Sequence, residues 1–253
     1  MRMSLAIIVG LIMTVMSGNE NGSRTGPDPT DYSGPHQAMM QAIHNDIARN
    51  WQVLGRENLS EPVALAMAKV PRHEFVPPAL RRSAYANHPL PIGHGQTISQ
   101  PTIVALMTDL MAVGADDTVL EVGTGSGYQA AVLSEVVTRG MVHTIEIVPE
   151  LAETARRRLA ALAYENVVVH TGDGYLGLPE EAPFAAIMVT AAAPEIPPPL
   201  LEQLAPGGRL VMPVGNHGAT QWLTVVERNR DGKFDEEVVL PVRFVPLTGI
   251  SED

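Results

Sequence analysis

The stretch "VLEVGTGSGYQAAVLSEVV", residues 119–137, combines a short apolar run, a glycine-rich turn and a segment with helical spacing of apolar residues. The run contains Glu121, and glycines follow at positions 123, 125 and 127. Glycine lacks Cβ, so its backbone can take positive φ and approach a ligand closely. The first N–H groups of the following helix remain free to bind that ligand. The stretch therefore predicts strand, tight turn and helix, with a nucleotide-type cofactor site at the turn.

The glycine spacing narrows the kind of cofactor. A dinucleotide fingerprint places its third glycine three residues after the second, whereas the order here is Gly-x-Gly-x-Gly. This disfavours a nicotinamide-dependent oxidoreductase. A glycine turn on its own can also be purely structural, so its interpretation depends on the residues downstream of it.

Two acidic residues follow the next two predicted strands. Glu146 ends the apolar run 141–147, and Asp173 lies in the Gly-Asp-Gly turn after the run that begins at Asn166. The carboxyl ends of parallel strands meet at one edge of a sheet, where a carboxylate can accept hydrogen bonds from both ribose hydroxyls. We expect these acids to converge on the glycine turn, although a surface charge and a simple turn former remain the alternatives.

Helix and strand alternate along most of the chain. Upstream of the turn, the spacing predicts an amphipathic helix over 36–54, a helix over 61–70, an irregular segment over 84–100 and a helix over 101–111. Downstream it predicts strands over 184–192 and 207–215, a helix over 149–162 and a final hairpin whose second strand spans 234–247. The sequence thus predicts an α/β protein with a doubly wound, Rossmann-like sheet, helices on both faces and an N-terminal helical extension.

Composition excludes several classes of function. Hydrophobic residues make up 45% of the 253 residues, which favours a folded protein with a sizeable core. The net charge of −11 argues against a sequence-independent grip on nucleic-acid phosphates. The chain has no cysteine and its eight histidines show no spacing typical of ligands, so no metal site is expected.

The first residues suggest export. Arg2 precedes a short apolar run and small residues, an order that resembles a secretory signal peptide over 1–17. A linker is expected over 18–35, and one domain over 36–253, divided into N-terminal helices and a substrate loop (36–111) and a cofactor-binding sheet with C-terminal strands (112–253). The protein is then periplasmic or secreted, without a stable membrane span after cleavage. If the start is misassigned, Met39 or Met40 opens the domain and the protein is cytoplasmic.

Four segments together resemble one enzyme family. They are "PLPIGHGQTISQPTIVALMT", "VLEVGTGSGYQAAVL", "VTAAAPEIPPPLLEQLAPGGRLVMPVG" and "VRFVPLTG". The glycine turn with its acids is similar to class I S-adenosylmethionine-dependent methyltransferases, and the four segments to protein-L-isoaspartate O-methyltransferases. The resemblance covers about residues 38–249, and "GQTISQP" is its most specific part.

The resemblance implies a division of roles. Ser99 stands at the family's active-site serine. The cofactor S-adenosylmethionine would be bound by residues at the strand ends, namely Glu121, Gly123, Thr124, Gly125, Gly127, Glu146, Asp173 and Gly174. The substrate would be shaped by the loop and a C-terminal wall, namely Thr97, Ile98, Gln100, Val245, Pro246, Leu247 and Thr248.

The activity implied is methylation of the free α-carboxylate of L-isoaspartyl residues in damaged proteins and peptides, by a monomer. A carboxylate is already ionised at neutral pH, so alignment matters more than a general base. The alternatives are a methyltransferase of the same fold acting on another carboxylate or small molecule, and an envelope protein that binds damaged segments without turnover. The second alternative arises because S-adenosylmethionine is made in the cytoplasm, where an exported enzyme would not meet it.

Overall fold

A computed structural model describes residues 30–55 and 57–249. The signal peptide expected over 1–17 and most of the expected linker lie outside these residues. From Ser33 onward the described chain forms one compact unit. None of the helices in these two described ranges combines the length and apolar character that crossing a membrane requires.

Three helices open the folded part: α1 (Ser33–Arg49), α2 (Trp51–Leu54) and α3 (Glu61–Lys69). The apolar face of α1 packs on the core as predicted, because Met39, Ile43 and Ile47 are all buried. The helix expected over 36–54 is, however, interrupted at Asn50 and begins at Ser33, inside the expected linker. Pro35 does not prevent this early start, since it lies in the first turn, where its missing N–H has no helical partner to lose.

The segment between α3 and the sheet contains short elements, which are η1 (Arg72–Phe75), η2 (Pro78–Ser83), β1 (Leu90–Gly93), β2 (Gln96–Ile98) and α4 (Pro101–Leu110). The expectation of irregular chain over 84–100 was wrong, because β1 and β2 form an antiparallel hairpin. Its turn uses positive φ at Gly93, His94 and Gly95 (98°, 52° and 73°). Strands this short, with glycine and proline, leave little β signal in the sequence.

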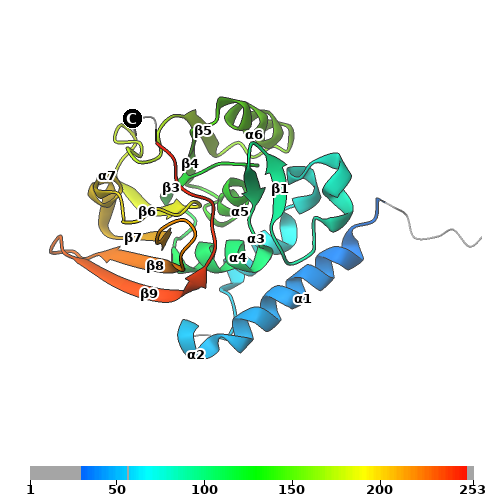
Figure 1. Ribbon diagram of the computed structural model, residues 1–253, viewed down its shortest axis with the longest axis horizontal. Coiled ribbons are helices and arrows are strands. Elements are labelled where there is room, and N and C mark those ends of the chain that lie inside the picture. The colour runs from blue at the N-terminus through cyan, green and yellow to red at the C-terminus, as the bar shows by residue number, and fades with distance from the viewer. Residues whose placement is uncertain (1–29, 56, 250–253) are drawn as a thin grey trace, which may run out of the picture. The chain divides into compact units, whose positions relative to one another are not determined.

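A seven-stranded sheet forms the centre (Figure 1). Its strands are β3 (Thr118–Val122), β4 (Met141–Glu146), β5 (Val167–Thr171), β6 (Phe184–Val189), β7 (Leu204–Val214), β8 (Gln221–Arg228) and β9 (Phe234–Val242). The order is β5-β4-β3-β6-β7-β8-β9, parallel through β7 and antiparallel beyond it. The predicted doubly wound sheet is confirmed. The last strand was predicted to reach residue 247 but ends at Val242.

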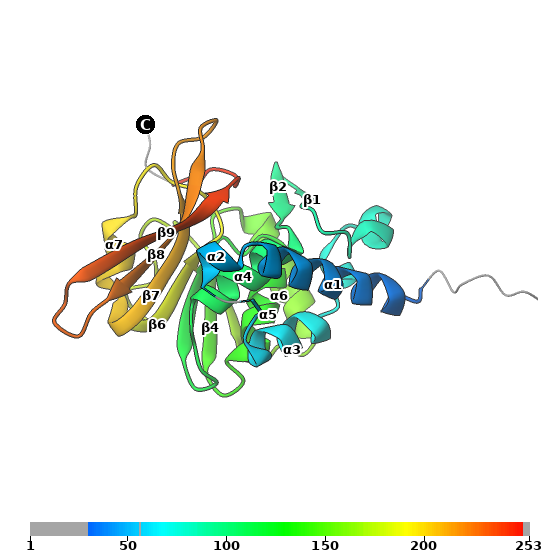
Figure 2. The ribbon, with the colours of Figure 1, turned by 90° about the horizontal axis from the view of Figure 1, so that it is seen from below.

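Helices cover both faces of the sheet, as predicted. Figure 2 shows α4, α5 (Tyr128–Val136) and α6 (Pro149–Ala161) on one side, with α1 and α3 beyond them, and α7 (Pro198–Glu202) on the other. On the α7 side, Leu200 packs into a core with alternate strand residues such as Val122 and Val189. Burying each such side chain contributes on the order of 1.5–3 kcal/mol, as an upper estimate.

The strand order reverses between β3 and β6. From β3 the chain builds outward through β4 to β5, and it then returns to the other side of β3 as β6. Ligands of open α/β sheets bind outside the carboxyl ends of the strands at such a point. The glycine turn follows β3 directly, and Thr190 follows β6, so both lie at this position.

Candidate functional site

The glycine turn has the backbone geometry that the sequence predicts. Gly123, Gly125 and Gly127 all have positive φ, at 99°, 52° and 86°. Thr190, directly after β6, holds the first of them, because its hydroxyl donates to the Gly123 carbonyl oxygen (2.7 Å) and lies 3.0 Å from that of Val122. A Cβ at position 123 would clash with this hydroxyl. Glycine is therefore required there by close packing as well as by φ.

Glu146 reaches the same turn from the end of β4. Its Oε2 accepts a hydrogen bond from the Gly125 N–H (2.7 Å), and its Oε1 accepts one from the Val148 N–H (3.0 Å). A carboxylate has about four acceptor positions, so about two remain for a ligand. The predicted convergence of Glu146 on the glycine turn is thus present in the structure.

Glu121 lies beneath the turn and is fully buried. Burial raises the pKa of its carboxyl to about 8; the hydrogen bond from Thr144 opposes the rise, and the charge of Glu146 adds to it. Thr144 Oγ1 donates to Glu121 Oε2 (2.6 Å) and lies 2.6 Å from Thr124 Oγ1. Glu121 Oε1 has no hydrogen-bond partner among the described residues. A buried carboxyl oxygen without a protein partner beside a glycine turn is open to a polar group of a ligand.

The third strand end is the Gly-Asp-Gly turn after β5. Asp173 is buried, and its Oδ1 accepts the Tyr175 N–H (2.9 Å), so it shapes the turn. Gly174 lies so close to Val122 that a Cβ would clash with that side chain. The turn is therefore packed directly against β3, next to the glycine turn.

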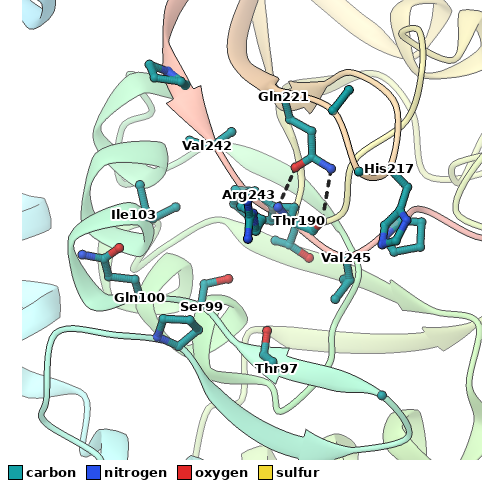
Figure 3. Close-up of a pocket in the computed structure, with 17 residues that line it drawn as sticks. Thr97, Ser99, Gln100, Ile103, Thr190, His217, Gln221, Val242, Arg243 and Val245 are labelled. Carbon is teal, nitrogen blue, oxygen red and sulfur yellow. Dashed lines mark hydrogen bonds between the residues drawn. The ribbon is translucent and has the colours of Figure 1, made fainter.

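Two adjoining cavities lie at this edge of the sheet. We call the smaller one, about 70 Å³, the inner cavity; it is lined by residues that include Gly123, Gly125, Glu146 and Gly174. The outer cavity, about 940 Å³, extends from Gln100 and Ile103 to the loop around His217 and the end of β9 (Figure 3). Five residues line both cavities, and these are Thr97, Ser99, Thr190, Val245 and Pro246. Ser99 thus stands at the junction between the two cavities.

The chain after β9, residues 243–248, forms the far wall of this junction, and we call it the C-terminal strap. It pairs with the chain after β6, since Ala192 N donates to Val245 O (2.8 Å) and Leu247 N donates to Ala192 O (2.7 Å). The Gln221 side chain holds the strap where it begins, because its amide exchanges two hydrogen bonds with the Phe244 backbone (2.6 and 3.2 Å). Figure 3 shows these two bonds beside Arg243.

The outer cavity differs from the rest of the molecule in charge. None of the described residues that line it is Asp or Glu, although the chain carries a net charge of −11. Arg243 lies in it, with His217 on the far side (Figure 3). The inner cavity is lined by Glu146 and by Val122, the residue next to Glu121 on β3. The outer cavity therefore favours an anionic ligand, and the inner cavity one with donors or positive charge.

The predicted site residues divide between the two cavities. Of the predicted substrate residues, Gln100 lines only the outer cavity, Leu247 and Thr248 line only the inner one, and both cavities are lined by Thr97, Val245 and Pro246. Ile98 is buried and lines neither. Among the predicted cofactor residues, those that support the inner cavity from behind rather than line it are Glu121, Thr124, Gly127 and Asp173. The roles of all these residues stay predictions.

Sequence reasoning missed several residues of the site. Thr190 follows the fourth parallel strand, so the same strand-end argument that found Glu146 could have found it. Arg243 lies just before the wall that was predicted to begin at Val245. No pattern in the sequence indicated Gln221, since its role depends on the path of a strap more than twenty residues later.

Two histidines that showed no ligand spacing come together on the neighbouring strands β4 and β5. His143 Nδ1 lies 3.2 Å from His170 Nε2, and one atom each of His143, His170 and Glu181 fall within 4.8 Å of one another. Burial lowers the pKa of His143, and the nearby Glu181 carboxylate opposes this shift. A hydrogen bond between the imidazoles accounts for their approach without an ion.

Comparison with known proteins places the chain in a family. The family model described as protein-L-isoaspartate(D-aspartate) O-methyltransferase matches residues 45–252. A protein-L-isoaspartate O-methyltransferase 2 from Syntrophobacter fumaroxidans is 52% identical over 244 residues, which cover 96% of each chain. A protein-L-isoaspartate O-methyltransferase 1 from Cupriavidus necator is 58% identical, over 77% of this chain and 74% of that one.

Solved structures agree with this match. A protein-L-isoaspartate O-methyltransferase with 29% identity superposes with a TM-score of 0.73, over 85% of this chain and 66% of that one. A putative enzyme of that name from Plasmodium falciparum, solved in complex with S-adenosyl-L-homocysteine, shares the fold with a TM-score of 0.65 and 24% identity, over 81% of this chain and 98% of that one. The chain therefore belongs to the protein-L-isoaspartate(D-aspartate) O-methyltransferase family.

Proposed function

We propose that the chain transfers the methyl group of S-adenosylmethionine to the free α-carboxylate of L-isoaspartyl residues in damaged proteins and peptides. Family membership supports this reaction. The observation that carries it is the junction at Ser99, where a cavity without acidic residues meets the cavity of the glycine turn. An anionic acceptor on one side and a cationic sulfonium on the other match the two charge environments.

The inner cavity supplies groups that fit S-adenosylmethionine. The backbone at Gly123 and Gly125 would lie against its methionine part, and the unpartnered oxygen of Glu121 would accept from its amino group, whose positive charge favours the ionised carboxylate. Glu146 has acceptor positions left for the ribose, and Gly174 with Asp173 would meet the adenine. The inner cavity is smaller than typical ligand pockets of about 300–1,000 Å³. We therefore expect the C-terminal strap to shift outward when the cofactor enters.

The chemistry requires alignment more than proton transfer. When bound, S-adenosylmethionine supplies an electrophilic methyl group. Ser99 would donate a hydrogen bond to one oxygen of the acceptor carboxylate and leave the other oxygen in line for attack; Thr97, Gln100 and the strap would hold the rest of the acceptor. A carboxylate and a sulfonium become a neutral ester and a neutral thioether, so excluding water from the junction favours the reaction.

The methyl ester then makes repair possible. The backbone nitrogen of the next residue attacks the ester carbonyl, loses its proton and releases methanol, which closes a succinimide. Water opens this ring at either carbonyl and returns partly normal aspartate. These later steps need no further group of the protein.

A methyl-transfer assay tests the proposal. Labelled S-adenosylmethionine is given with an isoaspartyl peptide, with the same peptide containing normal aspartate, and with small carboxylic acids. We expect label in the isoaspartyl peptide only. The Ser99→Ala variant should lose about ten- to a hundredfold in kcat/KM with unchanged cofactor affinity, whereas the exposed control Ser83→Ala should not.

Other outcomes would favour the alternatives. Label in small carboxylates alone indicates a methyltransferase with another acceptor, and peptide binding without transfer indicates a binding protein. Export is a further proposal, supported by the leader-like first residues. N-terminal sequencing of the protein from separated cell fractions distinguishes export from a start at Met39 or Met40. Sedimentation of the purified protein tests whether it is a monomer.

A further inference from the structure

Arg72 is a fully buried cation behind the junction of the two cavities. It begins η1, and its side chain has no exposed surface. None of the ion pairs found among residues 30–55 and 57–249 includes it. Burial lowers its pKa, but an arginine side chain stays protonated in proteins. Burying a guanidinium without a carboxylate is unfavourable by several kcal/mol, so its partners require an explanation.

Those partners are backbone carbonyls at both ends of one segment. Arg72 Nε donates to Ala84 O (2.7 Å), and Nη2 donates to Ser99 O (2.7 Å). Ala84 precedes the β1–β2 hairpin, and Ser99 follows it directly. The planar guanidinium thus ties the end of η2 to the residue that follows the hairpin, with a fixed arrangement of donors that a flexible ammonium group lacks.

A third contact links Arg72 to the cofactor side. Its Cζ lies 4.7 Å from the centroid of the Tyr128 ring. Tyr128 is the first residue of α5 and follows Gly127 of the glycine turn. One side chain therefore joins the residue at the cavity junction to the helix that starts at the glycine turn.

We propose that Arg72 is a positioning residue for methyl transfer, which holds the Ser99 backbone so that the Ser99 hydroxyl stays at the junction of the inner and outer cavities. This inference rests on the proposed function. Holding the carbonyl of Ser99 from behind limits rotation of that residue, and displacements of about 1 Å from the productive geometry lower rates by up to about a hundredfold. The buried charge also favours an anionic group at the junction over a neutral one.

Two substitutions separate geometry from charge. Arg72→Lys keeps the positive charge but loses the planar guanidinium that donates to both carbonyls. Arg72→Met keeps much of the side-chain length and removes the charge. We expect Arg72→Lys to lower kcat for an isoaspartyl peptide about ten- to a hundredfold, with the Kd for S-adenosylmethionine within about threefold of wild type. Arg72→Met should in addition raise KM for the peptide. The matched control is Arg82→Met, at an exposed arginine of η2, which should leave kcat, KM for the peptide and Kd for S-adenosylmethionine unchanged.

A double-mutant cycle with Ser99→Ala decides whether Arg72 acts through Ser99. If it does, Arg72→Lys should lower kcat by less than about threefold in the Ser99→Ala background. Equal losses in both backgrounds, or full kcat in a folded Arg72→Lys variant, would overturn the proposal. If the lysine variant does not fold, the same cycle is made with Arg72→Met, which places no charge in the core. If the wild-type protein methylates no isoaspartyl peptide, the proposed function and this inference are both overturned. If the wild type is active but the effects of the Arg72 and Ser99 substitutions are independent of each other, only this inference is overturned.

Discussion

The inner and outer cavities are assembled in different ways. The inner cavity is lined mainly by the ends of neighbouring parallel strands and the turns that follow them, such as Gly123, Glu146 and Gly174. The outer cavity is assembled from a hairpin near residue 95, a loop near residue 217 and the start of the C-terminal strap. Its parts are held by a few long-range hydrogen bonds, including those of Arg72 and Gln221. On the proposed function, binding of the methyl donor would thus depend mainly on local geometry at the strand ends, and recognition of the acceptor would depend on how distant segments are tied together.

The largest expected effect concerns Thr190, which lines both cavities and is in contact with Gly123. Gly123→Ala places a Cβ against Thr190 Oγ1 at a φ of 99°. We expect a loss of at least about 1–3 kcal/mol in unfolding free energy from backbone strain, and loss of cofactor binding from the clash. Denaturant unfolding and calorimetric titration with S-adenosylmethionine measure both.

Gly232→Ala is the matched control for this variant. Its φ is 84°, but no atom lies within 4 Å of the added Cβ, so only the strain remains. If both variants lost the same stability and both still bound the cofactor, close packing between Gly123 and Thr190 would not matter, and the two cavities would not depend on a common point.

The second effect concerns the inner cavity alone and depends on pH. Because the pKa of Glu121 is raised from 4.5 to about 8, the folded protein holds a proton that the unfolded chain has lost between these values. This group therefore contributes stability below about pH 4.5 that is lost as the pH rises toward 8, at about 1.4 kcal/mol per pH unit. Urea unfolding at several pH values should show this fall in wild type and a flatter profile in Glu121→Gln.

Glu165→Gln serves as the control, since Glu165 is exposed and should leave the wild-type profile unchanged. If wild type and Glu121→Gln have parallel profiles between pH 5 and pH 8, the Glu121 carboxyl is ionised when folded. The inner cavity would then have two negative charges, on Glu121 and Glu146, before the cofactor binds. The difference in charge between the inner and outer cavities would be larger than inferred.

The sequence predicted the inner cavity better than the outer one for a physical reason. The glycine turn and Glu146 are specified by neighbours in the chain and by the rule that parallel strands end at one edge, so both were found. The hairpin at 90–98 was missed because its turn conformation and pairing leave little local signal. The end of β9 was misplaced because Gln221 and Ala192 draw the chain away from the sheet after Val242.

The resemblance predicts a role for Ser99, yet neither it nor the local sequence pattern indicated what holds Ser99 in place. Arg72 looks like an ordinary surface arginine in the sequence, since it stands between prolines in a polar segment. Its burial follows from contacts with Ala84 at the end of η2, with Ser99 after the hairpin and with Tyr128 of α5. Such a role depends on three segments that meet in space, and residues adjacent in the sequence give no information about that meeting.

The smallest expected effect concerns the outer cavity alone. Arg243 is exposed and lies in a cavity without acidic residues, so it should attract the acceptor carboxylate or a nearby one. Arg243→Gln should raise KM for an isoaspartyl peptide about tenfold, equivalent to about 1.4 kcal/mol, with little change in kcat or in cofactor affinity. Because the charge is solvated, the difference should shrink as salt is raised from low to physiological concentration and beyond. Arg230→Gln, in the exposed loop between β8 and β9, is the control with the same change in net charge. If Arg230→Gln raised KM as much, attraction by overall charge would explain the effect, and the outer cavity would owe its preference for anions to the whole surface rather than to Arg243.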